Sequence, residues 1–424
     1  MNLKPLIQLR LRAALIALMG LCVSVSGCSQ SNNAQATLKT ESGCVQLADA
    51  PLPPDSLRLA RLAFDAASKL PLVPHAKNRA RMQASVVRTC AAVGLLHTGE
   101  SFIDRMDGWQ QALALTQLAR AAARGERPES ALSSLHRAES AVSNASQEYF
   151  AQEWQRDRIR AGIAATLIHL GRSPDAAEFE KDLEPSESGI PLLARSEVCR
   201  ADEVDAQIAR IDQALASKHF EQLRSACEAC VALLKQVSRD ASQVNALETK
   251  VLEVNATFPA QSRFAVLAQL AESALQRGQT GIAKKRLADA MASIPPGSML
   301  PEERIPLLGR VAELQFRMGE TIAADEQLQA ALELYKASRD RVVDIARASA
   351  LRALAEAAHA MKQHDQAFQL WMNALDEGVA NPNSRPRADD LVATCCSILR
   401  TGAVPPPSML ERAERIAAAL GEPW

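Results

Sequence analysis

The sequence predicts an all-α fold, an α-solenoid of antiparallel helix pairs that repeat about every 41–47 residues. From about residue 55 onward, nearly every segment is rich in Ala, Leu, Arg, Glu and Gln. Alternating runs of β-branched residues, which would indicate strands, are absent. Small residues also recur at fixed distances on both sides of a short turn, as expected where two helices pack closely.

The first 27 residues have the pattern of a signal peptide: a basic start, then the apolar run AALIALMGLCVSV, which is short for a membrane span. Residues 25–28, Val-Ser-Gly-Cys, resemble the lipobox of bacterial lipoproteins. In that family the chain is cut before the cysteine, which is then acylated, and two or more acyl chains hold a protein at a bilayer. The resemblance implies lipidation of Cys28. Ser29 in the next position implies the outer membrane if the host is Gram-negative, and ordinary secretion with an incidental cysteine is the alternative.

Four further segments follow the signal peptide. Residues 28–54 are polar and small at first and end in prolines, so they predict a lipidated, flexible tether. Residues 55–184 are expected to form N-terminal helical repeats. Residues 185–255 are helical in pattern but degenerate, with a possible hinge, and residues 256–424 hold the clearest repeats and a final copy that would cap the array.

The clearest repeats begin at Leu267, Leu308 and Leu351. With Gly278, Gly319 and Lys362 taken as turn residues, an alanine stands seven residues before, five after and twelve after each turn: Ala271, Ala283 and Ala290, then Ala312, Ala324 and Ala331, then Ala355, Ala367 and Ala374. Alanine is needed where two helix backbones approach most closely, and leucine fills the wider gaps. The pattern therefore predicts two antiparallel helices around each turn.

This spacing resembles the tetratricopeptide repeat, although successive turns are 41 and 43 residues apart against about 34 in that family. The resemblance implies that the first helix of each pair lines a groove that binds a partner. Glu272, Glu313 and Glu356 each lie six residues before a turn, and they would form an acidic ladder for a basic or amide-rich peptide. The alternative is that they form exposed salt bridges with nearby arginines such as Arg277, Arg317 and Arg352.

A basic residue recurs fifteen residues before each turn, near the expected start of a first helix. These residues are Arg156, Arg263, Arg304, Arg347 and Arg387. A cation at a helix N-terminus opposes the helix dipole. We therefore expect each arginine to pair with an acidic group of the preceding repeat, with a polyanion-binding stripe as the alternative.

The stretch SACEACVALL places Cys227 and Cys230 three residues apart. A redox pair would sit at a helix N-terminus, where the dipole lowers the thiol pKa, but this pair falls about two turns into the expected second helix of a degenerate repeat. Val231 stands where c-type haem attachment needs histidine, and no second pair at metal-binding spacing exists. The sequence therefore predicts buried core residues, with a disulfide, redox or metal role as alternatives.

Composition excludes several functions. The chain has 48 basic and 49 acidic residues and a net charge of −1, so it has no global basic field for nucleic acid. Aromatic residues are only 4%, and Trp109, Trp154, Trp371 and Trp424 are too far apart in sequence to suggest a sugar-binding cluster. No GxGxxG, P-loop, HExxH or GxSxG motif is present, and no cofactor or metal is predicted.

The sequence thus predicts a lipid-anchored scaffold of the cell envelope that binds an unidentified protein or peptide and is not an enzyme. One alternative is a lipoprotein built on similar repeats that captures a solute or glycan. The other is a thiol oxidoreductase that uses Cys227 and Cys230.

Overall fold

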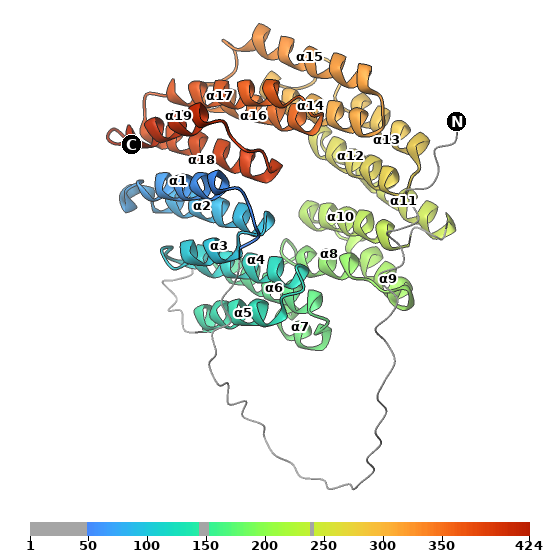
Figure 1. The fold of residues 1–424 in the computed structure, drawn as a ribbon. Coiled ribbons are helices and arrows are strands. Elements are labelled where there is room, and N and C mark those ends of the chain that lie inside the picture. The colour runs from blue at the N-terminus through green and yellow to red at the C-terminus, as the bar shows by residue number, and fades with distance from the viewer. Residues whose placement is uncertain (1–48, 144–151, 238–240) are drawn as a thin grey trace, which may run out of the picture. The chain divides into compact units, whose positions relative to one another are not determined.

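The computed structural model describes residues 49–143, 152–237 and 241–424, and these residues form an all-α, solenoid-like fold without strands (Figure 1). The predicted signal peptide, Cys28 and most of the predicted tether lie outside the described residues. The all-α fold class is therefore confirmed.

The N-terminal helices are α1 (Pro54–Ser68), α2 (Leu72–Ala92), α3 (Leu96–Ile103), α4 (Trp109–Arg124), α5 (Pro128–Ser143), α6 (Glu153–His169), α7 (Ser173–Glu180), α8 (Gly189–Glu197), α9 (Val204–Leu215) and α10 (Phe220–Gln236). The C-terminal helices are α11 (Ala241–Asn255), α12 (Ala260–Gln276), α13 (Thr280–Ala292), α14 (Pro301–Arg317), α15 (Thr321–Ser338), α16 (Asp344–Ala360), α17 (His364–Val379), α18 (Ser384–Thr401) and α19 (Pro407–Ala418). A short 3-10 helix, Ala201–Glu203, precedes α9.

The three best repeats share one turn geometry, as the sequence predicts. Gly278, Gly319 and Lys362 all have left-handed backbones, with φ of 74°, 83° and 65°. In each turn the next N–H donates to a carbonyl five residues earlier at 2.9 Å (Gln279 to Ala274, Glu320 to Gln315, Gln363 to Ala358). This bond satisfies a carbonyl that the ending helix leaves free. The same turn therefore reverses the chain three times.

The alanines predicted at the helix contacts are all buried. Each of the nine residues at the seven-before, five-after and twelve-after positions is 0% exposed: Ala271, Ala283, Ala290, Ala312, Ala324, Ala331, Ala355, Ala367 and Ala374. A methyl side chain lets the paired helices α12–α13, α14–α15 and α16–α17 approach closely, and these are among the most extensive helix contacts in the described fold. The alanine pattern thus specifies the helix pairs.

The even-numbered helices α2 to α18 form what we name the inner row. Each of them contacts the next even-numbered helix, from α2–α4 through α16–α18, and α18 returns to contact α2. The odd-numbered helices, which we name the outer helices, pack against this row. Consecutive helix pairs are thus joined mainly through the inner row, and the order of contacts makes a closed circuit (Figure 1).

The circuit closes where the first two helices, α1 and α2, pack against the last two helices, α18 and α19. Arg81 of α2 donates to both carboxylate oxygens of Asp389 in α18, at 2.9 and 2.8 Å. Lys69, after α1, donates to the carbonyl of Ala417 in α19 at 2.6 Å. One continuous apolar cluster contains Phe64 of α1 together with residues of α18 and α19. The final copy, expected from the sequence to cap the array, instead packs on its beginning, because both end faces are apolar and bury each other.

The segment predicted as degenerate, residues 185–255, is helical and has a core of its own. A second apolar cluster extends from Cys199 to Leu270 and includes Ile211, Leu233 and Phe258. It links α8 and α10 to α12. The segment therefore continues the inner row.

The end of the predicted tether is attached to the fold. The Asp49 carboxylate accepts hydrogen bonds from the Thr98 amide at 3.0 Å and the Thr98 hydroxyl at 2.5 Å, and the Ala50 amide donates to the Gly94 carbonyl at 2.9 Å. Within the described ranges, none of the helices is both long enough and apolar enough to span a bilayer.

The contact between α8 and α10 leads to a testable prediction about packing. A Cβ added at Gly189 of α8 would lie 2.2 Å from the Ser225 Cβ of α10. Gly189→Ala should therefore lower the free energy of unfolding by about 1–3 kcal/mol through overpacking, and adding Ser225→Gly should restore part of it. Chemical unfolding followed by circular dichroism measures both changes.

Gly281 of α13 is the matched control, because an added Cβ there meets nothing within 4 Å. Gly281→Ala should leave stability unchanged or raise it by up to about 1 kcal/mol. Equal effects of the two alanine substitutions would contradict the close contact at Gly189.

Candidate functional site

The three predicted glutamates lie on consecutive helices of the inner row. Glu272 is on α12, Glu313 on α14 and Glu356 on α16, and all three are partly exposed. Their common register is therefore as the sequence predicts. Their carboxylates, however, already form ion pairs with arginines.

Two arginines of α14 bind the first two glutamates. Glu272 accepts from Arg310 at 2.6 Å and from Arg317 at 2.7 Å. Arg310 also reaches Glu313 at 2.6 Å. Burial raises the Glu272 pKa, but the hydrogen bond from Arg317 and the charges of Arg310 and Arg317 outweigh burial and lower it. The pair of arginines thus ties α12 to α14.

Glu356 of α16 likewise pairs with Arg400 of α18, at 2.8 Å. The salt-bridge alternative therefore describes the three glutamates, although Arg317, which pairs with Glu272 and Glu313, is the only suggested partner that does so among the described residues. Arg352 instead binds Asp390 at 3.0 Å, and Arg277 binds Glu248 at 2.6 Å. The bridges of Arg400 and Arg352 connect α16 and α18 within the inner row, whereas Arg277, at the end of α12, binds Glu248 of the outer helix α11.

Three of the five recurrent arginines near the helix starts bind backbone carbonyls. Arg263 donates to the Phe258 carbonyl at 2.9 Å, Arg347 to the Arg339 and Val342 carbonyls at 3.0 Å, and Arg387 to the Pro382 carbonyl at 2.7 Å. The expected acidic partner on the preceding repeat is therefore wrong for these three. Each guanidinium instead bonds carbonyls at or just after the end of the preceding outer helix, where the helix dipole favours a cation.

Cys227 and Cys230 are core residues, as predicted. Both are 0% exposed and neither forms a disulfide. Burial raises the pKa of Cys227 to about 12 and that of Cys230 further, so neither thiol is activated as a nucleophile. Their helix, α10, belongs to the inner row between α8 and α12 and is not the second helix of a pair, because the short α9 occupies the outer position.

Tertiary structure brings two tryptophans together that the sequence separates. The rings of Trp109, at the start of α4, and Trp154, at the start of α6, pack edge to face with centroids 5.3 Å apart. The Arg158 guanidinium lies 5.3 Å above the Trp154 ring. Trp371, in contrast, is fully buried and donates to the Ser397 hydroxyl at 2.9 Å. The prediction that no tryptophans gather is therefore wrong for this pair, because α4 and α6 are neighbours in the inner row.

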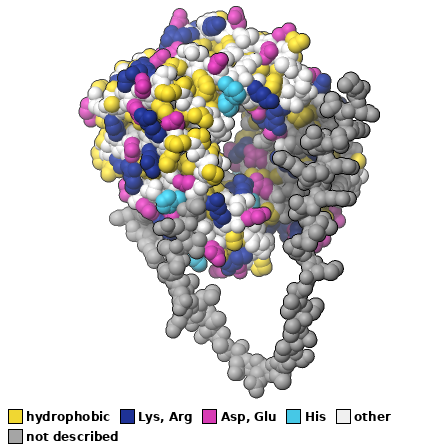
Figure 2. Space-filling model, in the orientation of Figure 1, with side chains coloured by type: hydrophobic (Ala, Val, Ile, Leu, Met, Phe, Trp, Pro, Cys, Tyr) yellow, Lys and Arg dark blue, Asp and Glu magenta, His cyan; other side chains and the backbone are white. Residues whose placement is uncertain are grey.

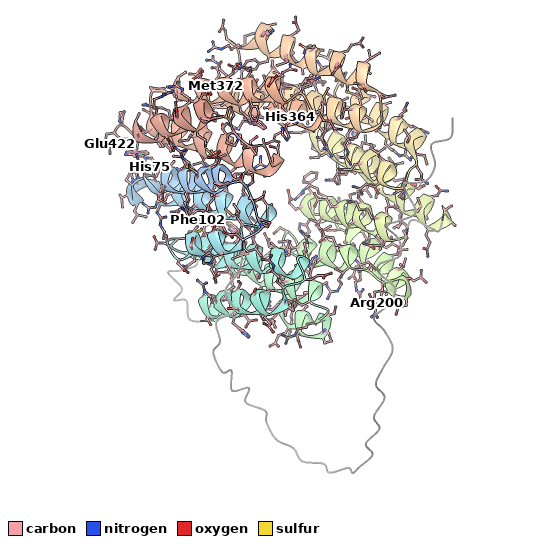
Figure 3. All side chains as sticks on the ribbon, in the orientation of Figure 1. His75, Phe102, Arg200, His364, Met372 and Glu422 are labelled. Atoms are coloured by element: carbon pink, nitrogen blue, oxygen red, sulfur yellow. The ribbon has the colours of Figure 1, made fainter. Side chains whose placement is uncertain are left out.

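Two histidines meet across the turn between α16 and α17. The Nδ1 atoms of His359 and His364 are 3.2 Å apart (Figure 3 labels His364). Burial, and then the neighbouring His364, lower the His359 pKa. Among the described residues no group of three or more His, Cys, Asp or Glu side chains could hold a metal ion.

Two of the cavities in the described part of the chain lie at the following helix contacts. One of about 300 Å³ lies between α15 and α17, with Leu332 and Leu370 in its wall, and there Tyr335 and Arg339 both bind the Glu377 carboxylate, at 2.9 and 2.6 Å. The other, of about 410 Å³, lies where α2 meets α16 and α18 and includes Arg385. Neither cavity was predicted, because both depend on contacts between repeats.

Comparisons with protein-family models and with curated proteins find no match to this chain.

The ion pairs lead to a second prediction, about stability. Glu248 is 7% exposed and binds Arg277 and Arg286, which are 4% and 14% exposed. Glu248→Gln would leave two buried cations without a full counter-charge and should lower the free energy of unfolding by about 3–5 kcal/mol. Chemical unfolding measures this change as a shift of the denaturant midpoint, provided that the dependence of the free energy of unfolding on denaturant concentration is the same for both proteins.

Glu356→Gln is the matched comparison, because Glu356 and Arg400 are 37% and 46% exposed. An exposed pair contributes about 0–1 kcal/mol. If both variants lose the same stability, burial does not decide the strength of these bridges.

Proposed function

We propose that the protein is a lipid-anchored scaffold of the cell envelope that holds a protein partner on its inner row. One observation carries the proposal: the inner row is a continuous surface made by successive helices, and ion pairs fix these helices to one another. Arg310 and Arg317 join α14 to α12, Arg400 joins α18 to α16, and Arg81 joins α2 to α18. A surface whose side chains are already held in place loses little entropy when a partner binds.

The resemblance to tetratricopeptide repeats supports the same surface, since first helices of such pairs line the partner groove. Glu272, Glu313 and Glu356 lie on this surface, but their role in the proposal changes. Because their carboxylates are paired with arginines, they hold adjacent helices in register, and the arginines limit what a basic peptide would gain from them.

The two rival functions have weaker support. Thiol oxidoreduction needs an accessible thiol of lowered pKa, whereas Cys227 and Cys230 are buried and their pKa values are raised. Solute or glycan capture is favoured only by Trp109 and Trp154, whose half-buried rings pack edge to face against each other. Protein binding is therefore the function that the fold supports best.

The inner-row proposal is tested by site-specific photo-crosslinking in cells that make the full-length chain. A photoreactive residue at Ser349 of α16 or Gln276 of α12, both exposed on the inner row, should crosslink to a partner protein. The same residue at Glu333 of α15 or Lys285 of α13, exposed on outer helices, should not. Crosslinks only at Glu333 or Lys285, on the outer helices, would contradict the proposal.

The anchor is tested separately by fractionation. Cys28→Ala should move the protein from the membrane fraction to the soluble fraction, because the acyl chains supply the membrane affinity. Ser29→Ala, which keeps the cysteine, should remain with the membrane. Membrane retention of the Cys28→Ala protein would contradict lipidation.

A further inference from the structure

Charge is divided between the two sets of helices, although the whole chain has a net charge of only −1. The inner-row helices contain 21 Lys and Arg against 13 Asp and Glu, a net charge of +8. The outer helices contain 11 Lys and Arg against 21 Asp and Glu, a net charge of −10. The helices that form the proposed binding surface are therefore the basic set. Figure 2 shows a hollow near the middle of the described surface, with both Lys or Arg and Asp or Glu side chains in view beside it.

The excess of positive charge is greatest in α2 and α4. These adjacent helices of the inner row contain six Lys or Arg and no Asp or Glu. On α4, Gln117, Arg120 and Arg124 are spaced three and four residues apart and form one partly exposed stripe. On α2, Arg81 and Arg88 form a similar stripe. The two stripes thus place cations on neighbouring helices of the row.

Arg120 stands out within this region because its side chain, although partly exposed, has a buried Nε without a partner. Among the described residues it forms no ion pair, and its Nε is buried without a hydrogen bond. One turn earlier, the buried Oε1 of Gln117 is also without a partner. Burial, and then the charge of Arg124, lower the Arg120 pKa to about 10 against the attraction of Glu197. A buried guanidinium is destabilising unless a counter-charge satisfies it.

Glu197, the carboxylate near Arg120, does not serve as its counter-ion. Glu197 of α8 accepts a hydrogen bond from Arg124, and its carboxylate lies 3.0 Å from the Nε2 of His169 in α6. Burial raises the Glu197 pKa, but these two partners outweigh burial and lower it to about 2. The carboxylate therefore already interacts with Arg124 and His169. Arg88 of α2 likewise has no ion pair or hydrogen bond among the described residues. Two arginines of adjacent helices thus remain without a counter-ion.

We propose that Arg120 of α4, together with Arg88 of the neighbouring helix α2, binds carboxylates of an acidic peptide segment of the partner, an inference that rests on the function proposed above. A planar guanidinium matches a carboxylate with two parallel hydrogen bonds, which gives geometry as well as charge. The acidic outer helices repel the same segment and so direct it to the inner row.

An acidic peptide fits this surface better than nucleic acid does. Single-stranded nucleic acid is held by aromatic side chains on which bases stack, and the part of α4 from Leu113 to Arg124 contains none. Glu197 and Asp389 border the two stripes and would repel a backbone that has a charge at every nucleotide. An acidic peptide can place neutral residues opposite these carboxylates.

The test uses the full-length protein in detergent micelles and a fluorescent peptide of ten glutamates. Fluorescence anisotropy should show binding that weakens as salt is added. Arg120→Gln should weaken it by about tenfold or more, the effect of losing a hydrogen bond to a charged group. Arg120→Lys, which keeps the charge but cannot donate two parallel hydrogen bonds, should have an affinity between those of the unchanged protein and Arg120→Gln. Arg415→Gln on outer helix α19, which removes an exposed arginine that forms no ion pair with any described residue, should have no effect.

Thermal unfolding separates binding from a structural role. Because Arg120 has no partner among the described residues, the Tm of Arg120→Gln should be unchanged or higher, whereas a lower Tm would assign Arg120 to the core and overturn the proposal. Equal binding of a ten-nucleotide single strand, or of a ten-lysine peptide, would also overturn it.

The outcome is distinguishable from that of the crosslinking experiment. If a partner crosslinks to the inner row but Arg120→Gln alters neither its capture nor peptide binding, the scaffold function stands and the acidic-segment inference is wrong. If the glutamate peptide binds through Arg120 but no partner crosslinks to the inner row, the site stands and the scaffold function is wrong.

Discussion

Every helix pair in this protein has apolar faces that it cannot bury by itself, and the structure depends on how those faces are covered. Neighbouring pairs cover one another along the row, as in any solenoid. The two ends cover each other: Phe64 of α1 belongs to the same apolar cluster as Leu391 of α18 and Leu410 of α19. Closure therefore removes the two exposed ends that would otherwise need a polar cap.

Closure also determines which side chains share a surface. Because α18 contacts both α1 and α2, Arg81 meets Asp389 across more than three hundred residues of sequence. The even-numbered helices become one uninterrupted row, and their excess of Lys and Arg is gathered in that row. In an open array the cations of α2 and α4 would lie far from the repeats with the clearest sequence pattern.

Ion pairs in this fold have two roles that depend on burial. Glu248 lies in a buried cluster with Arg277 and Arg286, where loss of one partner leaves an uncompensated charge. Glu356 and Arg400 are exposed, and such a pair contributes little stability while it still orients both side chains. Arg120 belongs to neither kind, since its partly exposed side chain has a buried Nε and no partner among the described residues.

The sequence by itself determined the all-α class, the turns at Gly278, Gly319 and Lys362, and the buried alanines on either side of them. These features depend on contacts within one helix pair, so a local pattern of small residues and left-handed turn positions specifies them. It also predicted the common register of Glu272, Glu313 and Glu356 and the burial of Cys227 and Cys230.

Only the tertiary structure decided the circuit, the contact of Trp109 with Trp154, the carbonyl partners of Arg263 and Arg347, and the unpaired state of Arg120. Each of these depends on which helices become neighbours. The sequence specifies the apolar faces, but it does not say which face of another repeat covers them. That choice decides whether a charged side chain meets a partner or remains available to bind one.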